Sequence, residues 1–337
     1  KGVESYAAHH ENGTGAFTIT ERQTDVKTVM VPFDGWWDTP VHNLTEVIMT
    51  PIGQDATRVA ALLSGEVDMV YPVPGQDIDR VNKNNGTSVL VGPELRTIFL
   101  FMDQFRDELL YSNVKGKNPF KDLKVRQAMY HAIDIEAIKK KIMRGLADPS
   151  AIMISPTLFD KSEGFQRLPY DRNKAKALLA EAGYPDGFET RMDCPNDRYV
   201  NDEQICQAIV SMLAKVGIKS SLVAQPKAKY FAAINPKGGS DYAFGLLGWT
   251  PGSFDSWNVL FNLLNTPTPA EGRGPYNYSG YSNARVDELT DMIGVETDKA
   301  KRDAMIEEAF KISTSEVATI PLHQQALAWG KDRKSVV

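Results

Sequence analysis

Apolar positions along the first hundred residues follow two spacings, one typical of strands and one typical of helices. Segment 17–33 is rich in Thr, Val, Ile and Phe, and polar residues interrupt it near 22–25, which predicts two strands around a turn. Segment 55–64 instead carries apolar residues at the helical spacing, and we expect Asp55 to cap this helix and Gly65 to end it. Further elements are expected as strands at 44–50, 67–71, 88–91 and 95–102 and as a short helix at 76–83.

Helical periodicity dominates the chain after residue 118. The clearest supersecondary unit is 188–224, where a strand is followed by a helix with Ile205, Ile209 and Leu213 on one face and then by a second strand. Such a strand–helix–strand crossover favours parallel strands. Other helices are expected at 123–132, 134–145, 171–183, 283–294 and 298–314, and other strands at 243–248 and 318–329.

Two candidate domain boundaries lie near 101–103 and near 320–324. If the chain crosses between lobes at both points, residues 1–102 and 321–337 form a first lobe, and residues 103–320 form a second α/β lobe. Two strands that link two lobes are typical of a hinge.

Composition restricts the class of protein. A length of 337 residues predicts about two domains. The net charge of −5 argues against nucleic-acid binding, which usually requires a basic face. No stretch approaches the roughly 20 consecutive apolar residues of a membrane helix. The chain opens at Lys1 without a leader, and we interpret it as a processed or excised piece, so the missing leader does not indicate the cytoplasm.

Cys194 and Cys206 are the only cysteines, and their spacing of twelve is not a metal-binding pattern. Two hypotheses remain open from the sequence: two buried thiols, or a disulfide formed in an oxidising compartment.

Signatures of catalysis are missing from the sequence. It contains no G-x-S-x-G, H-E-x-x-H, P-loop or C-x-x-C motif, so we expect no enzyme. The pair His9-His10 sits near the chain start, and His131 falls in a predicted helix, where packing is the ordinary role. We expect no metal site and no cofactor.

The segment 248–261 combines features of a ligand pocket. It follows a buried strand and mixes aromatic side chains with polar ones, as a pocket with apolar walls and a few fixed polar groups requires. Packing in the core is the alternative for its aromatic residues. The candidate ligand-binding residues are Trp249, Thr250, Phe254, Asp255, Trp257 and Asn258.

Arg96 lies within an otherwise apolar predicted strand. A charged residue there is seldom buried without a partner, so it pairs with a carboxylate of the protein or meets an anionic ligand. Met69 and Tyr71 end a neighbouring predicted strand and are candidates for the same cleft. We expect Arg96 on one side of the cleft and the segment 249–258 on the other.

Five blocks in a fixed order resemble a known family. They are GTGAF at 13–17, DATRVAALLSGEVD at 55–68, NPFKDLKVRQAMYHAID at 118–134, YDRNKAKALLAEAGYPDGF at 170–188, and Gly-Trp at 248–249 followed by YSGYSNARVD at 278–287. This order resembles the extracytoplasmic solute-binding proteins of family 5, the dipeptide-, oligopeptide- and nickel-binding type of ABC importers.

The resemblance implies a fold and a role. The expected fold is α/β, a periplasmic-binding-protein-like bilobed clamp with mixed sheets, from which the N-terminal part of the first lobe is missing. The expected protein is a periplasmic monomer that captures a small-molecule or peptide ligand by hinge closure and delivers it to the permease subunits of an ABC transporter at the membrane.

One departure from the family concerns the ligand. Peptide-binding members often carry an Asp just after Gly-Trp, whereas this chain has Thr250-Pro251-Gly252, and the nearest acid is Asp255. An oligopeptide or dipeptide is the first ligand that we expect, and an opine, a sugar or a metal chelate is the alternative. A sensor module of the same fold is an alternative role for the protein. A hydrolase is a further alternative, and it would require a nucleophile beside a base.

Overall fold

Residue contacts divide the chain into two compact units. The computed structural model describes residues 10–236 and 239–334. Unit 1 comprises 1–90 and 329–337, and unit 2 comprises 91–328. The chain passes between the units twice, within β5 (Thr87–Met102) and within β10 (Ile320–Asp332). These divisions differ from the expected ones at 102 and 321, because most of both long strands belongs to unit 2.

A small antiparallel sheet begins unit 1. It contains β1 (Phe17–Gln23), β2 (Lys27–Pro32) and β3 (Val47–Met49) in sequence order. The first two strands flank a turn, as the sequence predicts. The register of β1 against β2 shifts between Ile19 and Glu21, which marks a bulge.

The rest of unit 1 is built on α1 (Asp55–Ser64), β4 (Met69–Val70) and α2 (Ile78–Lys83). The N-cap of α1 is Gln54, so the expectation that Asp55 caps this helix is wrong. Asp55 lies in the first turn and binds Arg58, because its backbone is already helical. Gly65 ends the helix as expected, at a φ of 77° that favours glycine.

Unit 2 contains a mixed sheet. Its strands lie in the order β10–β5–β9–β7–β8, and β6 (Ala147–Pro149) pairs with β10. β7 (Phe188–Pro195) is parallel to β8 (Ile218–Gln225) and to β9 (Phe244–Trp249), whereas β9 is antiparallel to β5. The strands expected at 88–91 and 95–102 are one continuous strand, since extended backbone is compatible with the φ of Pro93.

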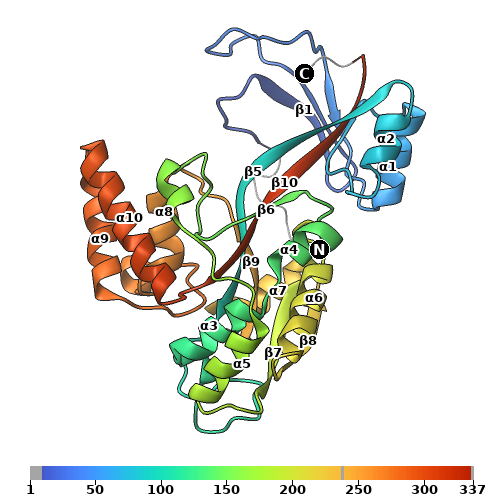
Figure 1. Ribbon diagram of the computed structural model, residues 1–337. Coiled ribbons are helices and arrows are strands. Elements are labelled where there is room, and N and C mark those ends of the chain that lie inside the picture. The colour runs from blue at the N-terminus through green and yellow to red at the C-terminus, as the bar shows by residue number, and fades with distance from the viewer. Residues whose placement is uncertain (1–9, 237–238, 335–337) are drawn as a thin grey trace. The chain divides into compact units, whose positions relative to one another are not determined.

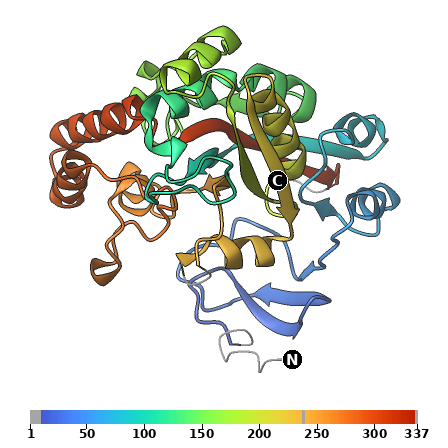
Figure 2. The ribbon, with the colours of Figure 1, turned by 90° about the horizontal axis from the view of Figure 1, so that it is seen from below.

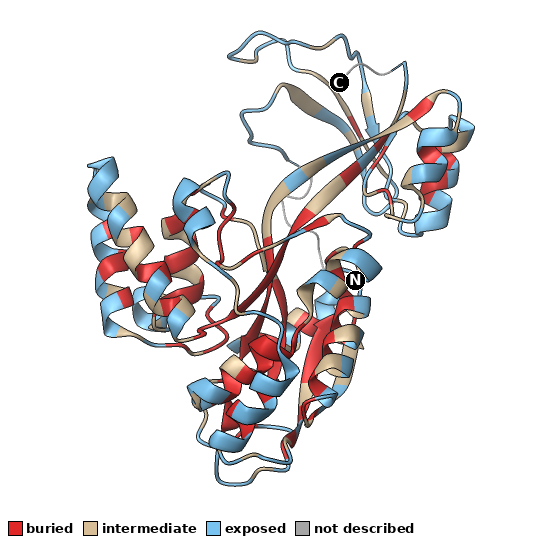
Figure 3. Ribbon diagram, viewed as in Figure 1, coloured by how far each residue is buried: buried red, intermediate tan, exposed pale blue. Residues whose placement is uncertain are grey.

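Helices cover both faces of this sheet (Figure 1). The first face packs on α3 (Leu123–Ala132), α5 (Arg172–Glu181) and α6 (Asp202–Ala214), and the second on α7 (Lys227–Ile234), α9 (Ala284–Val295) and α10 (Lys299–Ser315). Strand β5 serves both, because Ile98, Leu100 and Met102 face the first core and Phe99 and Phe101 the second. Figure 2 shows α9 and α10 side by side, away from α6 and β8. Figure 3 shows the buried residues concentrated in the central strands.

Short helical segments complete unit 2. They are η2 (Pro119–Lys121), α4 (Ile135–Ala137), η3 (Ile138–Ile142), η4 (Asp160–Gly164), α8 (Ser256–Val259), η6 (Leu260–Leu264) and η7 (Pro269–Glu271).

Within the described ranges, no helix combines the length and the apolar character needed to cross a bilayer.

The predicted strand–helix–strand unit is confirmed as β7–α6–β8, with its two strands parallel. Cys194 on β7 and Cys206 on α6 form a disulfide, and both are fully buried. The structure therefore selects the disulfide from the two open hypotheses. Disulfides of this kind are typical of proteins that fold in an oxidising compartment.

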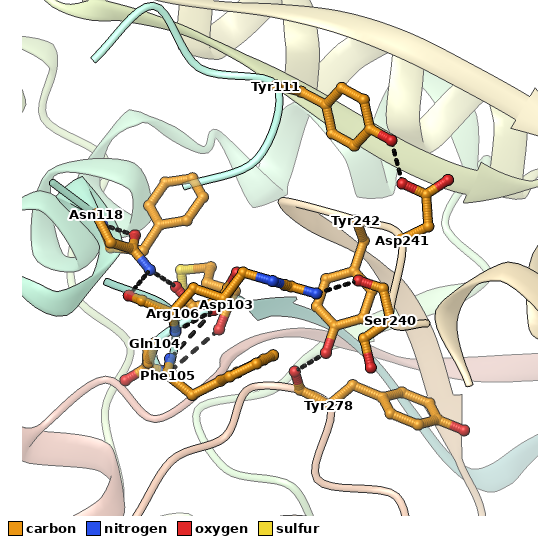
Figure 4. Close-up of polar contacts among 12 residues, drawn as sticks. Asp103, Gln104, Phe105, Arg106, Tyr111, Asn118, Ser240, Asp241, Tyr242 and Tyr278 are labelled. Carbon is orange, nitrogen blue, oxygen red and sulfur yellow. Dashed lines mark hydrogen bonds and ion pairs between the residues drawn. The ribbon is translucent and has the colours of Figure 1, made fainter. Parts of the chain in front are cut away.

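A buried ionic network fixes the chain where β5 ends (Figure 4). The Asp103 side chain is fully buried, accepts hydrogen bonds from the backbone N–H groups of Phe105 and Arg106, and pairs with the Arg106 guanidinium at 2.6 Å. Arg106 also donates to the carbonyl oxygen of Ser240, and Asn118 donates to the carbonyl oxygen of Asp103. This network satisfies the polar groups that the turn would otherwise bury unpaired.

His323 lies buried in β10 beside the Arg167 guanidinium. Neither ring nitrogen has a hydrogen-bond partner among the described residues. Burial, assisted by the positive charge of Arg167, lowers the pKa of His323 to about 4, against a small opposing effect of Asp148. The imidazole is therefore neutral at pH 7.

We expect this histidine to make folding acid-sensitive. The unfolded chain binds a proton near pH 6.5 and the folded chain only near pH 4, so stability present above pH 6.5 falls as the pH drops between these values. The free energy of unfolding should decrease by roughly 3 kcal/mol over this range because of His323. Urea unfolding of wild type and His323→Gln at several pH values measures this. A variant with the same pH dependence as wild type would contradict the prediction.

Candidate functional site

The antiparallel pairing of β5 and β9 places Arg96 against the end of β9. Its Nε donates to the hydroxyl of Thr250 at 3.2 Å, and its guanidinium pairs with the Glu94 carboxylate at 3.2 Å. Glu94 and Arg96 are two residues apart on one strand, so both side chains project to the same face. Of the two alternatives for Arg96, the structure shows a carboxylate partner within the chain.

Tyr199, in the loop after β7, lies against Arg96 and Gly248. Arg96 lies 5.8 Å from the centre of its ring and Arg198 lies 5.3 Å from it. The Tyr199 hydroxyl donates to the carbonyl oxygen of Gly248 at 3.4 Å. A Cβ atom at Gly248 would come within 2.8 Å of the Tyr199 ring and 2.9 Å of the Arg96 side chain, so only glycine permits this packing.

Gln325 of β10 connects these groups. Its Nε2 donates to Glu94 at 2.8 Å, and its Oε1 accepts from the backbone N–H of Val200 at 3.1 Å. Burial raises the pKa of Glu94 above its ordinary value, while Arg96, Gln325 and Arg198 oppose this shift. We call the six residues Glu94, Arg96, Arg198, Tyr199, Thr250 and Gln325 the Arg96 cluster.

The Arg96 cluster carries an excess of positive charge. Arg96 and Arg198 are cationic, and Glu94 is its one acid. The side chain of Arg198 is exposed, and no described acid forms an ion pair with it. An exposed guanidinium without an acid partner is well suited to bind a carboxylate, because its planar N–H groups match that geometry.

Trp249 belongs to the other side of the sheet. It pairs in register with Thr97, the neighbour of Arg96, so Trp249 and Arg96 project to opposite faces. The Trp249 indole donates to Asn258 at 3.0 Å and lies 5.0 Å from the half-exposed ring of Tyr276. Arg96 and segment 249–258, which were expected on the two sides of a cleft, both belong to unit 2, and Arg96 donates a hydrogen bond to Thr250 directly.

Asp255 and Trp257 have structural partners. Asp255 is the N-cap of α8, and its two carboxylate oxygens each lie 2.8 Å from the Arg302 guanidinium. Burial opposes ionisation, but Arg302 and the backbone N–H of Trp257 outweigh it and lower the pKa of Asp255. The Trp257 indole donates to the carbonyl oxygen of Thr290 and stacks on Phe261.

The remaining candidates are Phe254, Met69 and Tyr71. Phe254 is 67 % exposed in the loop after β9. Met69 and Tyr71 belong to unit 1, where Tyr71 stacks on Trp329 at 4.2 Å between ring centres. A shared role of these three residues with Arg96 stays a prediction.

Sequence reasoning missed Glu94, Arg198, Tyr199 and Gln325. Two signals in the sequence could have found part of this set. Glu94 occupies the same strand face as Arg96, and the loop with Arg198 follows the carboxyl end of a predicted parallel strand, where ligand sites gather. Gln325 of β10 could be found only from the three-dimensional structure, because the sequence does not show which strands are neighbours.

The positions of the histidine, cysteine and acidic side chains determine whether a metal ion could be held. Among the described residues, no three His, Cys, Asp or Glu side chains are grouped as a metal ion would require. His9 lies outside the described residues, and His131 is buried with its Nδ1 at 2.7 Å from the carbonyl oxygen of Pro169.

Comparison with known proteins gives a consistent result. The model of the bacterial extracellular solute-binding proteins, family 5 Middle, matches residues 2–270. The glutathione-binding protein GsiB of Salmonella paratyphi A is 29 % identical over 319 residues, which cover 93 % of this chain and 59 % of that protein. The chain thus spans about three fifths of the length of that relative.

Solved structures show the same fold. The periplasmic binding protein DppA from Helicobacter pylori, an ABC transporter-associated protein in complex with the peptide STSA, superposes with a TM-score of 0.81 at 24 % identity, covering 96 % of this chain and 59 % of that chain. AgaA from A. tumefacien R10, in complex with agropinic acid, gives 0.77 at 24 % identity, covering 97 % and 64 %. The expected periplasmic-binding-protein-like α/β fold with a mixed sheet is confirmed. The chain belongs to the bacterial extracellular solute-binding proteins of family 5.

Proposed function

We propose that this protein is the solute-binding component of an ABC importer, which captures a small peptide and delivers it to the permease at the membrane. Family membership over residues 2–270 is the observation that carries this proposal. The matched relatives and structural neighbours include proteins named for glutathione and solved with a bound peptide. Family 5 proteins of this kind bind solutes and are not enzymes.

The chemistry of the Arg96 cluster supports a ligand with a free carboxylate. The Glu94 carboxylate, which is partly buried, pairs with Arg96 and lies within the charge influence of Arg198, so these three groups together carry a net positive charge when all are ionised. A ligand carboxylate bound by Arg198 would neutralise that charge through paired N–H···O hydrogen bonds. We leave Asp255 and Trp257 out of the proposed ligand contacts, since Arg302 and Thr290 engage them.

An opine is the second candidate ligand. AgaA, which has the same fold, was solved with agropinic acid. This chain has no Asp directly after Gly248-Trp249 that could pair with an ammonium group of the ligand. That absence favours a ligand whose binding does not depend on such a pair.

Capture would follow from hinge closure about the two linking strands. A ligand drives closure only through contacts that are better in the closed state than in the open one. The buried disulfide supports action in an oxidising compartment such as the periplasm.

Calorimetric titration of the intact natural protein tests this function. The panel contains glutathione, dipeptides, tripeptides, an opine, a neutral sugar and a nickel–histidine chelate. We expect saturable binding of at least one peptide and no binding of the sugar. Folded protein that binds none of the carboxylate-bearing compounds, or binds the sugar alone, would contradict the proposal.

A further inference from the structure

A groove on unit 2 lies outside the Arg96 cluster and has the size of a small-molecule site. It is formed between α10, α3 and segment 161–168 and has a volume of about 540 Å³. Ligand sites for small organic molecules usually measure about 300–1,000 Å³. None of the Arg96 cluster residues lines this groove.

The rim of the groove has an excess of positive charge. Lys161 and Lys311 both bind the Glu307 carboxylate, at 3.3 and 2.5 Å. Glu307 is the only acid among the described residues that line the groove. One carboxylate shared by two ammonium groups leaves one positive charge available, and the hydroxyls of Thr314 and Ser315 lie on the same side of the groove.

Tyr130 lines the groove and carries a buried polar group without a described partner. Tyr130 is 2 % exposed, and its hydroxyl has no hydrogen-bond partner among the described residues. Leaving a buried hydroxyl unpaired is destabilising, so such groups in native proteins are usually satisfied by a water molecule or a bound group. Tyr130 and Thr314 also line a narrow apolar cleft that lies next to the groove.

A partly buried cation lies against the Tyr130 ring. The Arg167 guanidinium is 4.8 Å from the centre of the Tyr130 ring. It donates to the backbone carbonyl oxygens of Ser150, Pro321 and Leu322, and no described carboxylate forms an ion pair with it. This charge adds to the positive field of Lys161 and Lys311, because a partly buried charge is screened less by solvent and salt than an exposed one.

The walls of the groove are apolar and include a strained residue. Phe165, Leu168 and Val317 supply its apolar surface. Val317 has a φ of 47°, which is an outlier for a β-branched side chain, and Arg126 holds its carbonyl oxygen at 3.1 Å. Strained backbone of this kind is concentrated at functional sites.

We propose that this groove is a second ligand site, which binds small monocarboxylates with an aromatic or aliphatic body. The carboxylate lies between Lys161 and Lys311, and the apolar body contacts Phe165, Leu168, Val317 and the Tyr130 ring. The site goes beyond the proposed transport function, because it uses none of the same residues.

Fluorine NMR on the intact protein tests the site, with 4-fluorophenylacetate as the probe and 4-fluorophenylacetamide as its neutral counterpart. We expect saturable binding of the acid at millimolar concentration and at least about tenfold weaker binding of the amide. The variant Lys311→Gln should weaken binding of the acid several-fold. Ser315→Trp, which adds bulk on the exposed end of α10, should abolish it.

The variant Arg198→Gln separates the two sites. It should leave probe binding unchanged, since Arg198 is no part of the groove. Loss of probe binding in this variant, with normal binding in Ser315→Trp, would place the probe in the Arg96 cluster and overturn the proposal. Absence of saturable binding, or equal affinity for the acid and the amide, would also overturn it.

Discussion

Replacing Asp103 by alanine is expected to lower the free energy of unfolding by about 3–5 kcal/mol. The change removes the acceptor of two backbone N–H groups and leaves the Arg106 guanidinium, whose side chain is 18 % exposed, without its carboxylate. A buried charge that loses its partner retains its desolvation cost, which explains why the effect exceeds that of a single lost hydrogen bond. Urea unfolding monitored by circular dichroism measures the change.

Asp107→Ala is the matched control for this prediction. Asp107 also pairs with a cation, Lys121, but its side chain is fully exposed, so the expected loss is far smaller than for Asp103→Ala. In the double variant Asp103→Ala with Arg106→Met, the loss of unfolding free energy should be smaller than the sum of the losses in the two single variants. A loss for Asp103→Ala no larger than that of the control would contradict the structural account of this network.

Replacing Arg198 by glutamine is expected to weaken binding of a carboxylate-bearing peptide by about 10–100-fold. A hydrogen bond to a charged group contributes about 1.5–3 kcal/mol, and each 1.4 kcal/mol corresponds to about a tenfold change in affinity. Glutamine keeps a hydrogen-bond donor, so the variant isolates the effect of the charge. Isothermal titration of the intact protein with its tightest peptide measures the change.

This variant should not affect folding. Arg198 is exposed and has no described ion pair, and surface changes of that kind usually alter stability by no more than about 0.5 kcal/mol. Lys219→Gln on β8 provides the control, because it removes an exposed cation outside the Arg96 cluster. Equal affinity in both variants would exclude Arg198 from the binding site.

Much of the fold could be predicted from local sequence patterns. The strand–helix–strand unit from Phe188 to Gln225 and the helices capped by Asp134, Asp171 and Asp298 were predicted because caps and apolar periodicity are local signals. The N-cap of α1 was wrongly predicted. Gln54 has an extended backbone and Asp55 is already helical, and this difference in backbone conformation is not visible in the sequence. The order of strands in the sheet depends on contacts between distant segments, which one sequence does not reveal.

The candidate site was predicted only in part. Arg96 and Thr250 were both selected from the sequence, and the structure joins them by a hydrogen bond across 154 positions. Asp255 was selected because it is the acid nearest to Gly248-Trp249, but its partner Arg302 lies 47 residues further along the chain. Pairing between charges that far apart depends on the tertiary fold, so local composition did not separate a structural acid from a ligand contact.

The most direct test of the central claim compares one peptide in two forms. The intact protein is titrated calorimetrically with the peptide that binds most tightly and with the same peptide carrying a C-terminal amide. The account predicts that the free acid binds at least about tenfold more tightly, because the Arg198 guanidinium, which has no ion-pair partner among the described residues, can pair with the carboxylate. Equal affinity of the two forms, or tighter binding of the amide, would contradict it.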